Sequence, residues 1–75
     1  MMTIKSHSFE GSSMLDKCQY DTDARELTVT FHNGKDYTYE NVSEEAYEGL
    51  TKAKSAGQFF GQYIKGNYDI KKDDK

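Results

Sequence analysis

The change from strand to helix lies within residues 37–47, which read Tyr37-Thr38-Tyr39-Glu40-Asn41-Val42-Ser43-Glu44-Glu45-Ala46-Tyr47. Before this stretch, apolar residues recur at every second position, as they do in half-buried β-strands. After it, they recur at spacings of three and four, as they do in amphipathic α-helices. The stretch therefore predicts an α+β chain in which the strands come first and the helices follow.

The helix that starts in this stretch has several of the usual N-terminal signals. Ser43 is a good N-cap residue, and Glu44 and Glu45 fall in the first turn, where the helix dipole favours negative charge. Val42 before the cap and Tyr47 after it have the spacing of a hydrophobic staple. The apolar stripe that follows predicts a helix of about three turns, and it consists of Ala46, Tyr47, Leu50 and Ala53.

A second helix is predicted after the break at Lys54-Ser55-Ala56-Gly57. Ser55 is its candidate N-cap, and Gly66 has the position of its C-terminal stop. The apolar side chains between them recur at helical spacing, which favours a role in the core, although one ring beside Lys65 could remain exposed. These side chains are Phe59, Phe60, Tyr63 and Ile64.

The clearest strand pattern covers residues 26–32, where Leu27, Val29 and Phe31 alternate with polar residues. Asn33-Gly34 follows, and this pair is a strong signal for a hairpin with a two-residue type I′ turn. That turn would place Thr30 opposite Tyr37, and Thr28 opposite Tyr39. On this register the tyrosines share a face with the threonines, whereas a slip of one residue would reverse the arrangement.

An earlier strand is predicted in the segment 14–21, where Cys18 and Tyr20 alternate. Leu15 lies three residues before Cys18, which indicates a β-bulge or a late strand start. A turn follows at residues 21–25. The complete prediction is a three-stranded antiparallel β-meander followed by two short α-helices packed on one face of the sheet. Residues 1–11 are predicted to be flexible or extended, 12–70 to form a single domain, and 71–75 to be a charged tail.

Length and composition limit the protein to one small domain. The chain has 75 residues, and a single cysteine, Cys18, excludes an internal disulfide bond. The N-terminal residues lack the apolar run of a signal peptide, and no segment approaches the roughly 20 apolar residues of a membrane span. These features predict a soluble cytoplasmic protein without a membrane partner.

Charge is unevenly distributed along the chain. Residues 1–51 contain four basic and ten acidic residues, whereas residues 52–75 contain six lysines and three aspartates. A chain polarised in this way could present a basic surface to a polyanion. The alternative is that the charges only keep a small aromatic-rich domain soluble.

The ordered set of motifs resembles the KTSC domain, a family named for its occurrence at the C-terminus of some lysyl-tRNA synthetases. The resemblance runs from Ser12 to about Tyr68 and includes a central Tyr-x-Tyr signature at Tyr37 and Tyr39. Flanking motifs are a serine pair at 12–13, Tyr20-Asp21, a Ser-x-Gly segment at 55–57 and Ile64-Lys65. Cys18 at an aliphatic position and Ser43 in place of proline depart from the family pattern. The resemblance implies the fold above, and RNA binding has been suggested for the family.

The candidate binding residues are tyrosines and lysines. Tyr37 and Tyr39 could form a platform on which bases stack, or both could belong to the core under the helices. The candidate phosphate contacts are Lys52, Lys54, Lys65, Lys71 and Lys72. Arginine is the side chain that binds phosphate or guanine through two hydrogen bonds at once, and the chain has one arginine, Arg25. Recognition of this kind is therefore not favoured by the sequence.

The residues that carry catalytic or metal chemistry do not form a recognisable motif. His7, Cys18 and His32 are scattered, and no CxxC or HxxxH spacing occurs. We therefore expect neither enzymatic activity nor a cofactor or metal. The function that the sequence favours is a small binding module for RNA or single-stranded nucleic acid, with affinity that falls steeply as salt is added. The alternative is a protein-interaction module that uses a sheet edge or an acidic surface.

Overall fold

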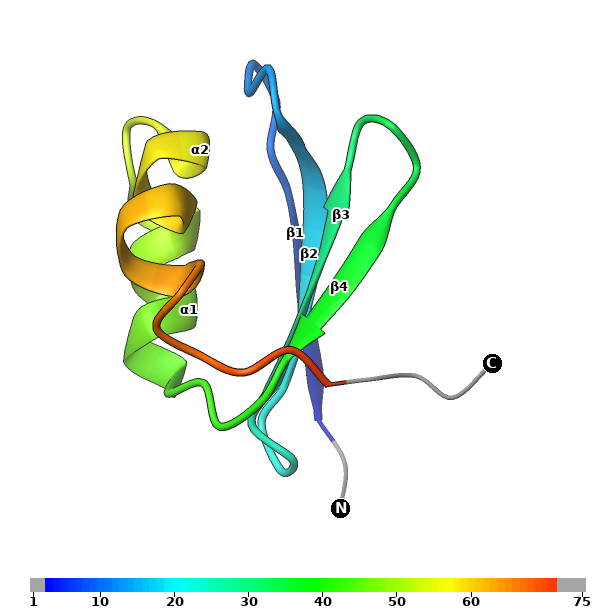
Figure 1. Ribbon diagram of the computed structural model, residues 1–75, viewed down its shortest axis with the longest axis vertical. Helices are drawn as coiled ribbons and strands as arrows, with labels where there is room; N and C mark the ends of the chain where they lie inside the picture. Colours follow the sequence, from blue (N-terminus) through cyan, green and yellow to red (C-terminus); the bar gives the residue numbers. More distant parts are fainter. Residues whose placement is uncertain (1–2, 72–75) are drawn as a thin grey trace.

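The computed structural model describes residues 3–71, which form a four-stranded antiparallel sheet with a helical layer over one face (Figure 1). The strands lie side by side in chain order, as β1 (Ile4–Ser8), β2 (Leu15–Asp21), β3 (Glu26–Phe31) and β4 (Asp36–Tyr39). The helical layer consists of α1 (Glu44–Lys52), α2 (Ala56–Phe59) and a π-helix, η1 (Phe60–Ile64), that continues α2. The α+β prediction is confirmed, with strands first and helices after them.

The predicted number of three strands is wrong, because the N-terminal segment supplies a fourth. β1 pairs with β2 over its whole length, from Ile4 opposite Asp21 to Ser8 opposite Lys17. Its sequence does not show the alternation of a half-buried strand, because the side chains toward the helical layer are those of Lys5 and His7. As an edge strand β1 has one neighbour, so its pairing depends on β2 rather than on its own apolar pattern.

The β3–β4 hairpin differs from the predicted register by one residue. Val29 lies opposite Tyr37, and Leu27 lies opposite Tyr39. The loop has three residues, since the N–H of Phe31 donates to the carbonyl of Lys35, and Gly34 alone in the loop has a positive φ, of 87°. This is the geometry of a type I turn followed by a left-handed residue, rather than a type I′ turn. Tyr37 and Tyr39 therefore share the covered face with Leu27 and Val29, not with the threonines.

The left-handed conformation at Gly34 makes this position sensitive to substitution. We expect Gly34→Ala to lower the free energy of unfolding by about 1–2 kcal/mol, because a Cβ is disfavoured at positive φ. Gly61→Ala is the matched control, since Gly61 lies in η1 with no atom within 4 Å of an added Cβ and without a positive φ. Urea unfolding curves would measure both. Equal effects of the two substitutions would contradict the turn geometry.

Of the two alternatives for the start of β2, a bulge or a late strand start, the structure shows a bulge. The pairing shifts between Leu15, which lies opposite Phe31, and Lys17, which lies opposite Thr30. The extra residue lets Leu15 and Cys18 point to the same face although they are three positions apart. Among residues 3–71, the core between the sheet and the helical layer contains thirteen buried side chains: Phe9, Leu15, Cys18, Tyr20, Leu27, Val29, Tyr39, Val42, Tyr47, Leu50, Ala56, Phe60 and Ile64.

The start of α1 has the predicted cap and staple. The Oγ of Ser43 accepts a hydrogen bond from the N–H of Ala46, and Val42 and Tyr47 are both buried. The Tyr47 ring stacks on Tyr20, whose hydroxyl donates to the carbonyl of Val42. These contacts fasten the chain at the point where it leaves the sheet, so that α1 folds back over the covered face.

The second helix begins and ends where predicted. The Oγ of Ser55 accepts from the N–H of Gln58, and Gly66 beyond the last turn has a φ of 87°. The final turn is wider than an α-turn, since the N–H of Lys65 donates to the carbonyl of Phe60. Phe60 and Ile64 are buried as predicted, whereas Tyr63 is 57% exposed, so its assignment to the core is wrong.

Candidate functional site

A groove of about 970 Å³ opens between the β3–β4 hairpin and the end of the helical layer. We call it the aromatic groove, because five rings line it: those of Phe31, Tyr37, Tyr39, Phe60 and Tyr68. Its outer wall is formed by the C-terminal segment, which runs from the end of η1 across the end of β4 (Figure 1). The groove therefore exists only because residues from both halves of the chain meet at this corner of the molecule.

The rings of the groove pack edge to face. The centroids of Phe31 and Tyr37 are 5.5 Å apart, those of Phe31 and Phe60 are 5.4 Å apart, and those of Tyr39 and Phe60 are 5.6 Å apart. The interplanar angles of 72–80° are those that aromatic quadrupoles prefer. Such packing fixes the rings, so that a ligand would meet an ordered apolar wall.

The two tyrosines of the Tyr-x-Tyr signature have different roles in this wall. Tyr39 is 3% exposed and belongs to the core, and burial raises the pKa of its hydroxyl. The prediction that Tyr39 forms part of an open stacking platform is therefore wrong, and the core alternative holds for it. Tyr37 is 37% exposed at the rim, so it is the signature tyrosine that a ligand could reach.

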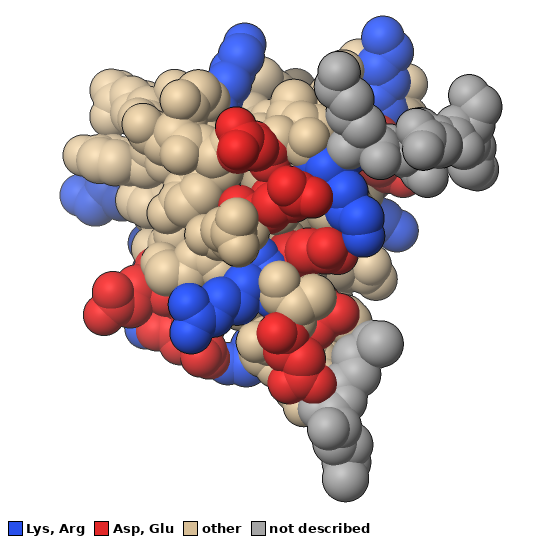
Figure 2. All heavy atoms as spheres, turned by 60° about the horizontal axis from the view of Figure 1, so that its bottom comes forward, with Lys and Arg blue, Asp and Glu red and all other residues tan. Residues whose placement is uncertain are grey.

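The structure does not gather the predicted lysines on one surface. Lys65 lines the aromatic groove, Lys54 lines a different cleft, and Lys52 ends α1. Lys71 lies at the uncovered face of the sheet, where its Nζ is 3.1 Å from Glu26 Oε2. Lys72 lies outside the described residues. Figure 2 shows a face on which blue basic side chains are scattered among red acidic ones, so a single basic surface is absent from this view.

Phe31, Phe60 and Tyr68 are groove residues that the sequence did not indicate as a site. The predicted hairpin register, which differs from the observed one by one residue, placed Phe31 on the face away from the tyrosines. Phe60 was assigned to the core, where it lies, but its ring also forms the floor of the groove. Gly34 is the sequence feature that could have indicated the correct register, because a glycine at the third loop position also fits a three-residue hairpin. That register brings Tyr37 and Tyr39 to the face where the groove lies.

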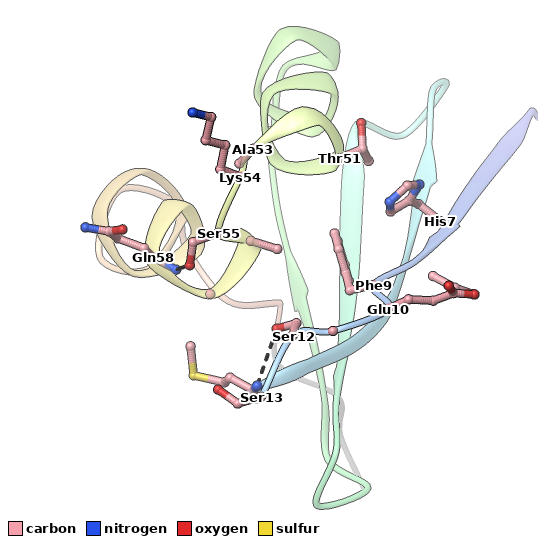
Figure 3. A pocket seen from close by; sticks show the side chains of 15 residues that line it. His7, Phe9, Glu10, Ser12, Ser13, Thr51, Ala53, Lys54, Ser55 and Gln58 are labelled. Atoms are coloured by element: carbon pink, nitrogen blue, oxygen red, sulfur yellow. Dashed lines mark hydrogen bonds between the residues drawn. The ribbon is translucent and has the colours of Figure 1, made fainter.

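A second, polar cleft of about 740 Å³ lies between the β1–β2 loop and the α1–α2 connection (Figure 3). Two of its serines bind backbone groups: Ser12 Oγ accepts from the N–H groups of Met14 and Leu15, and Ser55 caps α2. His7 packs edge-on against Phe9, with centroids 5.0 Å apart, and the Lys54 side chain points away from the cleft in Figure 3. Within residues 3–71, no serine of this cleft is hydrogen-bonded to His7.

Two further side chains with catalytic or metal-binding chemistry are those of Cys18, which is buried, and His32, which is hydrogen-bonded. Burial raises the pKa of the Cys18 thiol to about 12, so that it stays protonated at neutral pH and packs as a small apolar group. His32 Nε2 is 2.8 Å from the carbonyl oxygen of Ser12, which ties the β1–β2 loop to the end of β3. Among residues 3–71, no three His, Cys, Asp or Glu side chains are grouped so that they could hold a metal ion. No helix in that range is long and apolar enough to cross a membrane.

Comparison with known proteins identifies the family. Residues 11–68 match the KTSC domain over more than half of the chain. The chain belongs to the KTSC domain family. A KTSC domain protein from Yersinia pestis, whose crystal structure is known, is 30% identical in sequence to this chain. The two structures superimpose with a TM-score of 0.84, and the match covers 96% of this chain and 100% of that one.

Two curated relatives are longer proteins that contain a similar segment. They are the lysine–tRNA ligases of Nostoc punctiforme and Trichormus variabilis, each 34% identical over 56 residues. The match covers 75% of this chain but 10% of either ligase. The KTSC domain described here is thus similar to a small part of those enzymes.

The KTSC motif residues lie at two separate places in the structure. Tyr37 and Tyr39 are in the wall of the aromatic groove, together with Lys65 at its rim. The serine pair and the Ser-x-Gly segment face each other across the polar cleft. Gly57 packs closely against the Met14 side chain there, since an added Cβ would lie 3.1 Å from Met14 Cε. The second set of motif residues therefore has a structural role, whereas the Tyr37 ring packs on Phe31 and is also partly exposed to solvent.

Proposed function

We propose that this KTSC domain is a non-enzymatic binding module that holds single-stranded nucleic acid in the aromatic groove. The observation that carries the proposal is the position of Tyr37, an ordered and partly exposed ring beside an apolar groove with Lys65 at its rim. Base–aromatic stacking contributes roughly 1–3 kcal/mol per base and tolerates any base. A lysine at the rim of the same groove would pair with a phosphate of the strand that is bound there.

The chemistry of the rim favours stacking over electrostatic attraction. The positive charge of Lys65 is offset by the negative charge of Asp69, which also lines the groove. The chain as a whole has a net charge of −3. The phosphate backbone would therefore gain little from the field of the protein. Affinity would come from the rings, which suits an unpaired strand whose bases are free to leave their own stack.

The relatives support RNA as the first ligand to test. Two of them are named lysine–tRNA ligases, so the similar segment occurs in proteins that act on a transfer RNA. The KTSC domain corresponds to a tenth of each ligase. We accordingly expect binding to unpaired RNA. The affinity should depend more on whether the RNA is single- or double-stranded than on its base sequence.

The proposal predicts a shallow salt dependence. With one or two phosphates neutralised, the affinity should fall about three- to sevenfold between 50 and 200 mM salt, since the slope for single strands is about −0.7 per phosphate. This is less steep than the sequence suggested, because Lys65 is the one predicted lysine among residues 3–71 that lines the groove. Fluorescence anisotropy with labelled single-stranded RNA and DNA octamers would measure it.

A blunt-ended duplex of two complementary RNA octamers, in which every base is paired, is the control for stacking in that titration. Binding to the single strands and not to the duplex is the expected result. The absence of any binding to RNA or DNA at tens of micromolar protein in 50 mM salt would overturn the proposed function.

A further inference from the structure

The two edges of the sheet are treated differently by the chain. Beyond β4, the C-terminal segment adds backbone hydrogen bonds, from Glu40 N to Asp69 O and from Lys71 N to Thr38 O, and Ile70 pairs with Tyr39. This segment covers the end of β4 like a short further strand. β1 is the opposite edge, and within residues 3–71 no segment pairs with its outer side. An uncovered edge strand is a template for pairing with another chain.

Three residues of β1 direct their backbone groups away from β2. The backbone hydrogen bonds at the two ends of the ladder, from Thr22 N to Thr3 O and from Phe9 N to Asp16 O, involve odd-numbered residues of this segment. Because antiparallel ladders alternate, the N–H and C=O groups of Ile4, Ser6 and Ser8 point outward. All three residues are exposed, and the Ile4 side chain is 50% accessible.

The outer edge of β1 lacks most devices that prevent pairing. It contains no proline, and its pairing with β2 has no bulge. The residues whose backbone groups point away from β2 have uncharged side chains. Its one charged residue, Lys5, is turned toward the helical layer and forms an ion pair with Glu44 of α1. Natural edge strands are commonly protected by a proline, a bulge or a charged side chain, and Lys5 is the one such feature in β1.

We propose that the outer edge of β1 pairs with β1 of a second copy of this chain, antiparallel and centred on Ser6. In this register Ser6 lies opposite Ser6 of the second copy, and Ile4 lies opposite Ser8 of the second copy. The outward N–H and C=O groups of all three residues are then satisfied in both copies. The two sheets join into one of eight strands, with the two-fold axis perpendicular to it.

The strand is compatible with a copy of itself in charge as well as in hydrogen bonding. Lys5 would face His7 of the second copy rather than another lysine, and its charge is already paired with Glu44. The aromatic groove lies at the β4 edge, so it stays open at both ends of the joined sheet. A ladder of five residues is much smaller than a standard interface of about 1,600 Å², so association should be weak and dependent on concentration.

Sedimentation velocity over a concentration series tests the proposal. The weight-average mass should rise from that of the 8.6 kDa monomer toward twice that value as the concentration approaches about 1 mM. Ser6→Pro removes the central outward N–H without breaking the ladder to β2, and should raise the dissociation constant about tenfold or more. Ser6→Thr keeps the N–H and favours a strand, so it should dimerise like the wild type.

A monomeric mass at every concentration would overturn the proposal. Association that is the same in Ser6→Pro and Ser6→Thr would overturn it as well, because another surface would then be responsible. Circular dichroism of both variants checks that they are folded. Amide hydrogen exchange gives an independent readout that does not depend on a substitution: protection at Ile4, Ser6 and Ser8 should increase with protein concentration. Protection that is independent of concentration would count against a second copy as the occupant of the edge.

Discussion

Leu50→Ala is expected to lower the free energy of unfolding by about 2–5 kcal/mol, the range for removing a fully buried leucine side chain. Leu50 lies on α1, is 0% exposed, and belongs to the core cluster under the helical layer. Natural domains have about 5–15 kcal/mol of stability in total, and a chain of this length lies toward the lower end. The substitution should therefore leave a large unfolded fraction at room temperature.

Urea unfolding followed by far-ultraviolet circular dichroism would measure this loss. Leu50→Met is the matched control, because a side chain of similar volume usually costs less than about 1.5 kcal/mol. If Leu50→Ala lost no more than Leu50→Met, α1 would not be held by the core as described.

Tyr37→Ala is expected to weaken binding of single-stranded nucleic acid by about 1–3 kcal/mol, which is roughly five- to 150-fold in dissociation constant. The reason is the loss of the exposed ring at the rim of the aromatic groove. Tyr37→Phe keeps the ring and should bind almost like the wild type. The anisotropy titration at 50 mM salt measures all three proteins under one condition.

Tyr63→Ala is the control for a general loss of aromatic surface. Tyr63 is more exposed than Tyr37, at 57%, but it packs against Phe59 and does not line the groove. Its removal should leave the affinity unchanged. Equal effects of Tyr37→Ala and Tyr63→Ala would show that the groove is not the binding site, even if the protein binds nucleic acid elsewhere.

The helix boundaries could be predicted because their causes are local. Ser43, Ser55 and Gly66 act on backbone groups within a few residues of their own positions. The bulge in β2 was predictable for a similar reason, since Leu15 and Cys18 must reach the same face of one strand. In each case the residues that make the interaction are read together in the sequence.

The hairpin register was predicted wrongly because two turn types compete for the same residues. Asn33-Gly34 suits a two-residue loop, but the three-residue loop places Tyr37 and Tyr39 on the face with Leu27 and Val29. Burial of the Tyr39 ring against Phe60 favours that choice, and Phe60 is 21 residues further along the chain. A contact that distant does not appear in the local pattern, and the error moved the candidate site to the wrong face.

By itself, the sequence determined the order of strands and helices, the caps and the staple around Ser43, because short-range hydrogen bonds and side-chain periodicity decide them. The tertiary structure decided which tyrosine is exposed, how the lysines are separated, and that Ile4–Ser8 forms an edge of the sheet. Those features depend on pairing and packing between segments far apart in the chain. Their free energy comes from apolar surface that is buried only when the helical layer closes over the sheet.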